Sequence, residues 1–443
     1  MKDKFFKLGV LFLLPRFSNE KHKTHKTQKG MVITLSNAKF TPEMKATHTI
    51  LIPDMLPIHF GLIMEIFRQN GYKMELLRTA TRNVVDEGLK NVHNDTCYPA
   101  LLVIGQFMDA LKSGRYDPDK TALLISQTGG GCRASNYIHL LRKALDKDYP
   151  QIPVLSINFS GLEKDSGFRI TIPMFYRMLY AVLYGDMLMS LYNQCRAYEV
   201  NKGDSQKVLD IWQKKIADSF KDKSYTKTKK YYREILNDFD GIKLSGEKKV
   251  KVGIVGEIYV KYSPLANNQL EDFLISEGCE PVVPAFLDFC LYCAVNNVND
   301  GILYNFSNKT TMLNSIGYKL IYKKQREMID IIKQHGKFAP PHDFEELRHY
   351  ADKYMHQGVK MGEGWLIPAE MAALAENGVE NIICTQPFGC LPNHIVAKGM
   401  SRVIKQAYPE ANIVAVDYDP GATRVNQENR IKLMLANARK AEK

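Results

Sequence analysis

The sequence predicts an α/β protein of two doubly wound units, of the Rossmann or flavodoxin type, whose parallel sheets are joined through a helical insert. Short apolar runs alternate with amphipathic stretches of helical length in two parts of the chain, which is typical of parallel strands covered by helices. The stretch between these parts has helical patterns but no credible strand. A chain of 443 residues is also too long for a single hydrophobic core, because single cores stop growing at roughly 250–300 residues.

The first unit is predicted to span residues 38–165. It follows a basic segment, residues 1–37, whose lysine- and histidine-rich part lacks periodicity and is predicted to be disordered. Four short apolar runs predict the strands, and the amphipathic stretches between them predict the helices. The strands are expected at 48–52, 73–77, 122–127 and 154–158, and the helices at about 60–70, 81–90, 99–112 and 134–146.

Residues 166–247 are predicted to form a helical insert and linker. Met174 to Cys195 is a long, apolar-rich helical stretch, and lysine- and tyrosine-bearing helices are expected around 205–219 and 226–237. The polar stretch from Asp238 to Lys248 contains two glycines, which indicates a link to the next unit.

The second unit is predicted over residues 248–443 and starts with the strand-like run Val-Lys-Val-Gly-Ile-Val-Gly-Glu at 250–257. Two α/β units that bracket a helical region leave a cleft, and open α/β sheets bind ligands at the carboxyl ends of their strands. The strands are expected at 251–255, 280–283, 381–385 and 412–417, and the helices around 268–277, 286–296, 313–334, 343–356, 368–376, 393–406 and 423–438.

Charge and cysteine content narrow the class of protein. The formal net charge is +12, but about half of the excess lies in residues 1–30, and the body lacks the basic and aromatic pattern of nucleic-acid binding. Eight cysteines are too sparse for a secreted disulfide scaffold. The apolar run from Leu8 to Leu14 lacks a cleavage site, and nothing else approaches the ~18 residues of a membrane span. We expect a cytoplasmic protein that binds neither nucleic acid nor membranes.

Three cysteines stand at predicted turns instead of inside apolar runs. Cys97 lies in Asn-Asp-Thr-Cys-Tyr-Pro, Cys132 in Gly-Gly-Gly-Cys-Arg, and Cys390 in Pro-Phe-Gly-Cys-Leu-Pro. Each turn precedes a predicted helix, whose backbone N–H groups and positive end stabilise a thiolate. All three turns fall at the expected cleft, so we predict that these cysteines share one metal cluster.

The spacing of these cysteines favours an iron–sulfur cluster over zinc. Structural zinc sites usually draw ligands from close Cys-x-x-Cys pairs, whereas an iron–sulfur cube tolerates wide separation. Three protein thiolates leave one iron open to substrate or water, which implies catalysis. The alternative reading is that these cysteines are small buried hydrophobes, since free cysteine is among the most buried residue types.

The other cysteines differ by context. Cys384 ends a buried strand six residues before Cys390 and is the alternate third ligand. Cys290 and Cys293 form a Cys-x-x-Cys pair inside an apolar helix, where core packing is the favoured interpretation.

Two polar residues near the third cysteine are candidate catalytic groups. Glu363 lies in Gly-Glu-Gly-Trp before a predicted helix, where it can act as a general base, orient a ligand, or simply favour the helix start. His394 follows Cys390 by four residues and can bond a substrate or remain a structural helix residue. The chain lacks the P-loop motif, Gly-x-Ser-x-Gly and His-Glu-x-x-His, which removes the common ATPase and hydrolase interpretations.

At these residues the chain resembles the 2-hydroxyacyl-CoA dehydratase family, in particular the dehydratase-like region of fused proteins that also carry an activator ATPase. The resemblance runs from about residue 38 to 438. The matching motifs lie at 94–99, 127–137, 256–261, 362–365 and 386–394.

The resemblance implies a [4Fe-4S] cluster bound by Cys97, Cys132 and Cys390, in a homodimer or heterodimer. It further implies that the open iron takes the carbonyl oxygen of a CoA thioester, and that an ATP-dependent iron–sulfur activator protein donates one electron. A ketyl radical then forms, the hydroxyl leaves, and the electron is returned. The acyl group of the substrate is not fixed by the sequence.

Two alternatives remain open at this point. Relatives of this branch include reductases of small molecules with a double-cubane [8Fe-9S] cluster, coupled to ATP. The other alternative is a non-catalytic electron-transfer or scaffold component.

Overall fold

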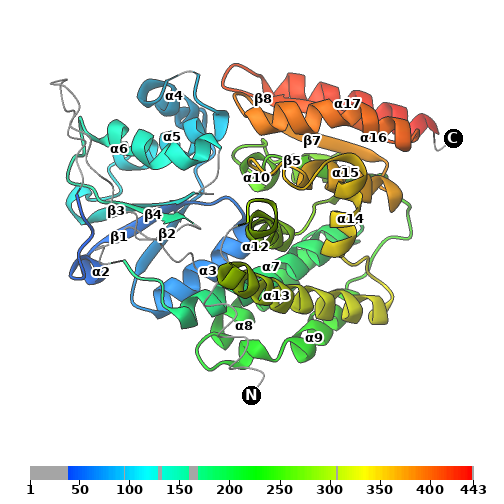
Figure 1. Ribbon diagram of the computed structural model, residues 1–443, viewed down its shortest axis with the longest axis horizontal. Coiled ribbons are helices and arrows are strands. Elements are labelled where there is room, and N and C mark those ends of the chain that lie inside the picture. The colour runs from blue at the N-terminus through cyan, green and yellow to red at the C-terminus, as the bar shows by residue number, and fades with distance from the viewer. Residues whose placement is uncertain (1–37, 94, 128–131, 159–167, 306–307, 442–443) are drawn as a thin grey trace.

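The computed structural model describes residues 38–441 except 94, 128–131, 159–167 and 306–307. The predicted disordered segment 1–37 lies outside the described residues. The described chain forms two four-stranded sheets, each with all strands parallel, as the sequence predicted (Figure 1).

The first sheet has the order β2-β1-β3-β4. Its central strands are buried on both faces, which explains their nearly continuous apolar runs; Ile50 and Leu51 are fully buried on opposite faces. Helices α3 and α7 cover one face, and α4, α5 and α6 cover the other. The elements are β1 (Thr49–Pro53), α3 (Pro57–Gln69), β2 (Lys73–Leu77), α4 (Arg82–Asn91), α5 (Tyr98–Lys112), β3 (Thr121–Gln127), α6 (Tyr137–Leu145) and β4 (Val154–Asn158), with a short α2 (Met44–Thr47) before them.

The second sheet repeats this topology with the order β6-β5-β7-β8. Its apolar residues join the core around α5, so one core continues from Leu123 of the first sheet to Ile254 of the second. The elements are β5 (Lys251–Gly256), α10 (Ile258–Tyr262), α11 (Leu270–Ser276), β6 (Glu280–Val282), α15 (Leu366–Glu376), β7 (Asn381–Pro387), a π-helix at Asn393–Lys398, α16 (Gly399–Ala407), β8 (Asn412–Tyr418) and α17 (Arg424–Ala441).

The helical segment between the sheets shares its core with helices of the second unit. Six helices pack together in the lower right of Figure 1, and α7 is buried on nearly all sides. Apolar residues lie around the whole circumference of this helix, so neighbouring elements have to cover it in every direction. The six are α7 (Ile172–Arg196), α8 (Asp204–Ser219), α9 (Thr228–Asp240), α12 (Phe286–Leu303), α13 (Asn308–His335) and α14 (Phe344–Tyr354).

Asp186 of α7 fixes the start of α12. Its carboxylate accepts hydrogen bonds from the backbone N–H groups of Phe286 and Leu287, at 2.7 and 2.9 Å. The same carboxylate lies 2.9 Å from Nε2 of His59 on α3. A carboxylate at a helix N-terminus meets unpaired N–H groups and the positive end of the helix dipole, so this contact orients α12 against α3 and α7.

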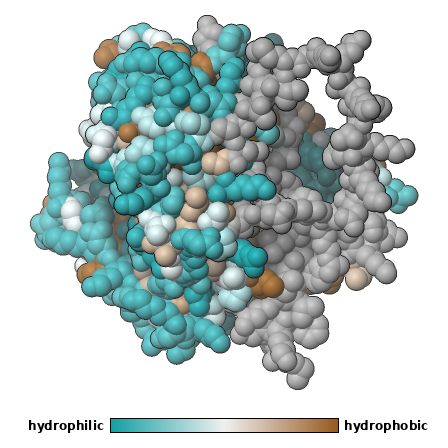
Figure 2. Space-filling model, turned by 90° about the vertical axis from the view of Figure 1, so that its left-hand side faces the viewer, coloured by the Kyte–Doolittle hydropathy of each residue, from teal (hydrophilic) through white to brown (hydrophobic). Residues whose placement is uncertain are grey.

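The described surface on the side of the first unit is mainly hydrophilic, with scattered hydrophobic residues (Figure 2). In the described ranges, no helix is both long and apolar enough to cross a bilayer.

Candidate functional site

The carboxyl ends of both sheets face one cavity. In each sheet the crossover direction reverses between the first strand and the third, that is, between β1 and β3 and between β5 and β7. Doubly wound sheets bind ligands at this reversal, because the loops diverge there. A cavity of about 620 Å³ is lined by Pro53 and Ser126 from the first unit and by Glu257 and Gly389 from the second. Both switch points therefore contribute to one site.

The three predicted cysteines meet in this cavity. Cys97 is the residue before α5, Cys132 precedes a short 3-10 helix (Arg133–Asn136), and Cys390 lies in the turn after β7; all three line the cavity. The turns at Cys97 and Cys390 are bonded directly, since the Tyr98 N–H donates to the Phe388 carbonyl at 3.0 Å. Residues almost three hundred positions apart thus form one wall.

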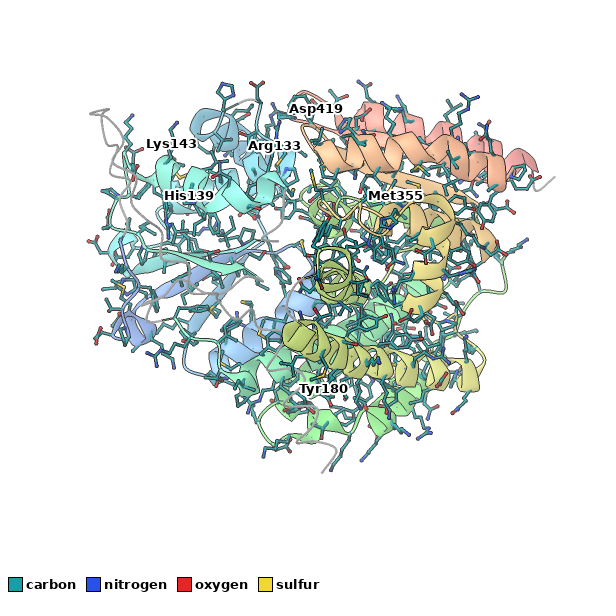
Figure 3. The ribbon with its side chains drawn as sticks, viewed as in Figure 1. Arg133, His139, Lys143, Tyr180, Met355 and Asp419 are labelled. Carbon is teal, nitrogen blue, oxygen red and sulfur yellow. The ribbon has the colours of Figure 1, made fainter. Side chains whose placement is uncertain are left out.

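Arg133 supports the same junction. Its Nη1 donates to the carbonyl of Asp95 at 2.6 Å, which ties the loop of Cys132 to the loop of Cys97. Figure 3 places Arg133 where the first unit meets the second. Among the described side chains that line the cavity, this guanidinium is the one positively charged group.

Gly389 allows the two cysteine turns to approach each other. Its φ is +72°, and a Cβ at this position would lie 3.0 Å from the Cα of Cys97. We expect Gly389→Ala to lower the free energy of unfolding by about 1–3 kcal/mol, because a left-handed conformation is strained for alanine and the turn is crowded. Urea unfolding measures this effect.

Gly399→Ala is the matched control. Gly399 has a helical φ of −62°, and nothing lies within 4 Å of the position of its Cβ. Alanine should be neutral or stabilising there. Equal destabilisation by the two substitutions would contradict the account of the Gly389 turn.

Burial favours the protonated form of the three thiols when no metal ion is bound. It raises the pKa of Cys97 and of Cys390, and it raises the pKa of Cys132 to about 11. The Tyr137 hydroxyl, 2.7 Å from the Cys97 sulfur, opposes this shift only in part. The expectation that backbone N–H groups and helix ends favour the thiolate is therefore outweighed by desolvation. A metal that binds here must replace these protons with positive charge.

The alternate ligand Cys384 does not reach the cavity. It lies in β7, is 1% exposed, and packs in the core beneath α15 and α16. Its sulfur is 3.7 Å from Oδ1 of Asn393. The geometry therefore selects Cys390 as the third cysteine of the site.

His394 is also outside the cavity. Its side chain is exposed on the π-helix, and its Nδ1 lies 2.8 Å from the carbonyl oxygen of Cys390. The histidine is absent from the residues that line the cavity. We therefore remove His394 from the candidate catalytic residues and assign it to the end of the Cys390 turn.

Cys290 and Cys293 border the cavity, which the sequence interpretation as core residues did not anticipate. Both lie on α12, are partly exposed, and line the same cavity as the three turn cysteines. Burial raises the pKa of each thiol, that of Cys293 to about 12. Residues three apart share one helix face, and here that face both packs against the hydrophobic core and borders the cavity.

Two carboxyl groups, the half-buried Glu257 and the buried Glu363, complete the polar wall. Glu257 follows β5, and its Oε2 accepts a hydrogen bond from the Val260 N–H at 2.9 Å. Glu363, predicted from its motif, is 5% exposed and accepts from the Ile258 N–H at 3.0 Å. Both line the cavity. The sequence analysis missed Glu257, although its place directly after a central strand of a parallel sheet was an available signal.

These carboxyl groups hold at least one proton at neutral pH. Burial, followed by the charge of Glu363, raises the pKa of Glu257 to about 8. Burial also raises the pKa of Glu363, while the Ile258 amide and Lys261 oppose the shift. Two nearby carboxyl groups with raised pKa values form an arrangement suited to proton transfer, because one carries the proton that the other can accept.

The pKa of Glu257 has a consequence for stability. Because its folded value of about 8 lies above the ordinary value of 4.5, the folded protein binds an extra proton between these limits. The free energy of unfolding should therefore fall as pH rises from about 5 to 8. Glu257→Gln should weaken this pH dependence of the free energy of unfolding. The control Glu410→Gln changes an exposed residue and should leave the pH dependence unchanged. Urea unfolding at three pH values tests this, and equal slopes for wild type and Glu257→Gln would contradict it.

Lys261 pairs with Glu370 directly behind the carboxyl pair. Its Nζ lies 2.9 and 3.2 Å from the two carboxylate oxygens, and both side chains are buried. We expect Lys261→Met to destabilise the fold by about 3–5 kcal/mol, because it leaves an uncompensated charge buried. The double variant Lys261→Met/Glu370→Met should recover most of this loss in denaturant titrations. A double variant as unstable as the single one would argue against a charge effect.

Within the described residues, no group of three or more histidine, cysteine, aspartate or glutamate side chains is placed to hold a metal ion. No protein-family model, curated protein or solved structure matches this chain. The assignment of function therefore depends on the cavity and on the sequence motifs that line it.

Proposed function

We propose that this chain is the iron–sulfur subunit of a 2-hydroxyacyl-CoA dehydratase, with a [4Fe-4S] cluster held by Cys97, Cys132 and Cys390. The observation that carries the proposal is the meeting of these three turn cysteines in one cavity at the switch points of both sheets. Their motifs are also the ones in which the sequence resembles that family.

The donor set consists of three cysteine thiols that line one cavity from three separate turns, a type of ligand that iron–sulfur clusters take. In a four-iron cube each protein thiolate binds a different iron, so the thiolates stand farther apart than the ligands of one ion. When bound, a cluster with three protein thiolates supplies redox chemistry and one iron that is open to a substrate oxygen.

The proposed reaction removes water from the substrate. The hydroxyl leaves carbon 2, a proton leaves carbon 3, and a double bond forms between these carbons. No net oxidation occurs, because the single electron supplied by the ATP-dependent activator is returned at the end. The proposal assigns ATP hydrolysis and the supply of this electron to a separate activator protein.

The two cavity carboxyl groups are suited to the proton steps. Glu257 holds a proton at neutral pH and can give it to the leaving hydroxyl. Glu363, fixed by the Ile258 amide, is the acceptor for the proton from carbon 3. The apolar lining of the rest of the cavity disfavours water there, which would protect reactive species from side reactions.

An anaerobic assay tests the proposal. The full chain is incubated with an activator of this family, ATP, a reductant and a 2-hydroxyacyl-CoA, and the products are measured by mass spectrometry. The proposal expects the 2-enoyl-CoA only when activator and ATP are both present. This product is lighter than the substrate by one water molecule, about 18 mass units. Product formation without them, or no product from any 2-hydroxyacyl-CoA by an iron-loaded chain, would contradict it.

One observation favours the double-cubane reductase as a second candidate. Five cysteines line the cavity, because Cys290 and Cys293 join the three turn cysteines. A larger cluster needs more protein ligands than a single cube. Anaerobic iron and sulfide analysis, read together with the oligomeric state, separates the two candidates: about four irons in each chain favour a single cube, whereas one cluster of about eight irons shared across a dimer favours the double cubane.

A further inference from the structure

We infer that the acyl group accepted by this site is uncharged and apolar, either a medium-length aliphatic chain or an aryl group. The inference rests on the proposed function and names the substrate class of the same cavity. Its basis is the part of the cavity that α3 and α7 line together, which we call the apolar arm. It is lined by Phe60, Ile63 and Phe67 of α3 and by Phe175, Met178 and Val182 of α7.

The apolar arm leads away from the cysteines. The residues on α3 run from its first turn, next to the carboxyl end of β1, to its last turn at Phe67. Seven residues of helix span about 10 Å, so the arm continues well past the strand ends where the cysteines lie. Leu124 of β3 also lines the cavity, on the face of the sheet that α3 covers. The arm thus penetrates the core beneath the first sheet.

The side chains along the apolar arm are not fully covered by the chain itself. Phe60, Ile63, Phe175 and Met178 are half-buried, although they lie among fully buried neighbours. Covering such side chains with an apolar group is favourable by about 25 cal/mol per Å² of apolar surface removed from water. A ligand with an apolar tail gains this stabilisation, whereas a short acyl group does not.

In the part of the chain that the structure describes, the charged side chains lie at the other end of the cavity. Among the described residues that line it, the Lys, Arg, Asp and Glu side chains are Arg133, Glu257 and Glu363, all next to the cysteine loops. An acyl group with a second carboxylate would have to bury this charge in the apolar arm without a partner. Such burial is strongly unfavourable. The arm therefore selects against dicarboxylic acyl groups as well as very short ones.

Calorimetric titration tests the inference without turnover. The anaerobically purified full chain, without activator or ATP, is titrated with octanoyl-CoA, 3-phenylpropionyl-CoA, glutaryl-CoA and acetyl-CoA, with free CoA as the reference. The first two are expected to bind at least about tenfold more tightly than the last two. Equal affinities, or a preference for glutaryl-CoA, would overturn the inference.

A pair of variants locates the binding. Ile63→Trp fills the apolar arm and should remove the preference for octanoyl-CoA, while Ile63→Leu, of equal volume, should keep it. A preference that persists in a folded Ile63→Trp variant would place the acyl group elsewhere and overturn the inference. Iron content of the same samples tests the proposed function separately: iron-free protein with an intact preference would count against the cluster and not against the apolar arm.

Discussion

Replacing Cys97, Cys132 or Cys390 singly by serine is expected to lower the iron content of anaerobically reconstituted protein to less than about a tenth of wild type. Each thiol supplies one of three attachments, and serine neither binds iron as well nor loses its proton as readily. Loss of one ligand leaves two attachments, which do not hold a cube. Iron and acid-labile sulfide per chain are the quantities to measure.

Cys384→Ser is the matched control for the cysteine substitutions. This thiol lies in the same region of the chain as Cys390 but outside the cavity, on β7 in the core beneath α15 and α16. Its replacement should leave iron content near wild type, even if stability falls. Loss of iron from Cys384→Ser together with full loading of Cys390→Ser would show that the third ligand has been assigned to the wrong residue.

Cys290→Ser and Cys293→Ser separate the two cluster types. If the cavity holds a single cube, both variants should keep about four irons per chain. If these two variants lose iron as the variants of the three turn cysteines do, the α12 pair belongs to the cluster. That result would favour the reductase over the dehydratase.

Glu257→Gln is expected to lower the rate of dehydration by a factor of about 10²–10⁴ while iron content stays at the wild-type level. Glutamine keeps the size of the side chain, but it has no acidic proton for the leaving hydroxyl. Burial and the charge of Glu363 raise the pKa of Glu257 to about 8, which favours its protonated form at pH 7. Wild-type activity should therefore decline above about pH 8, as Glu257 loses its proton.

Two further variants complete this test: Glu363→Gln, and a control substitution away from the Glu257 and Glu363 pair. Glu363→Gln should also reduce the rate, because it removes the proposed acceptor for the carbon-3 proton. Lys432→Gln, on the exposed face of α17, should leave the rate unchanged. An iron-loaded Glu257→Gln variant with the wild-type rate and pH profile would remove Glu257 from the chemistry.

The fold was largely predictable because its parallel strands are buried on both faces and its helices are amphipathic. Strand β3 was expected at 122–127 and found at Thr121–Gln127, and α5 was expected at 99–112 and found at Tyr98–Lys112. Periodicity does not say which element covers which. The shared core of α7 with α12 and α13 therefore appeared only in the structure.

The site was predictable where the chain itself marks a turn. Glycines and prolines flank Cys132 and Cys390, and these turns lie at strand ends, where parallel sheets bind ligands. Cys290 and Cys293 lie in an apolar helix, and an apolar face looks the same in sequence whether it borders a core or a cavity. The place of Glu257 after a central strand was an available signal, but the sequence does not show that Glu363 lies close enough to raise its pKa.

The most direct test of the three-cysteine site is Mössbauer spectroscopy of the chain reconstituted with ⁵⁷Fe, recorded with and without an apolar 2-hydroxyacyl-CoA. A cube with three protein thiolates predicts that about one iron in four differs from the rest and that its signal changes when the thioester is added. An iron-free chain, or a cluster whose irons all remain unaffected by the thioester, would contradict the account.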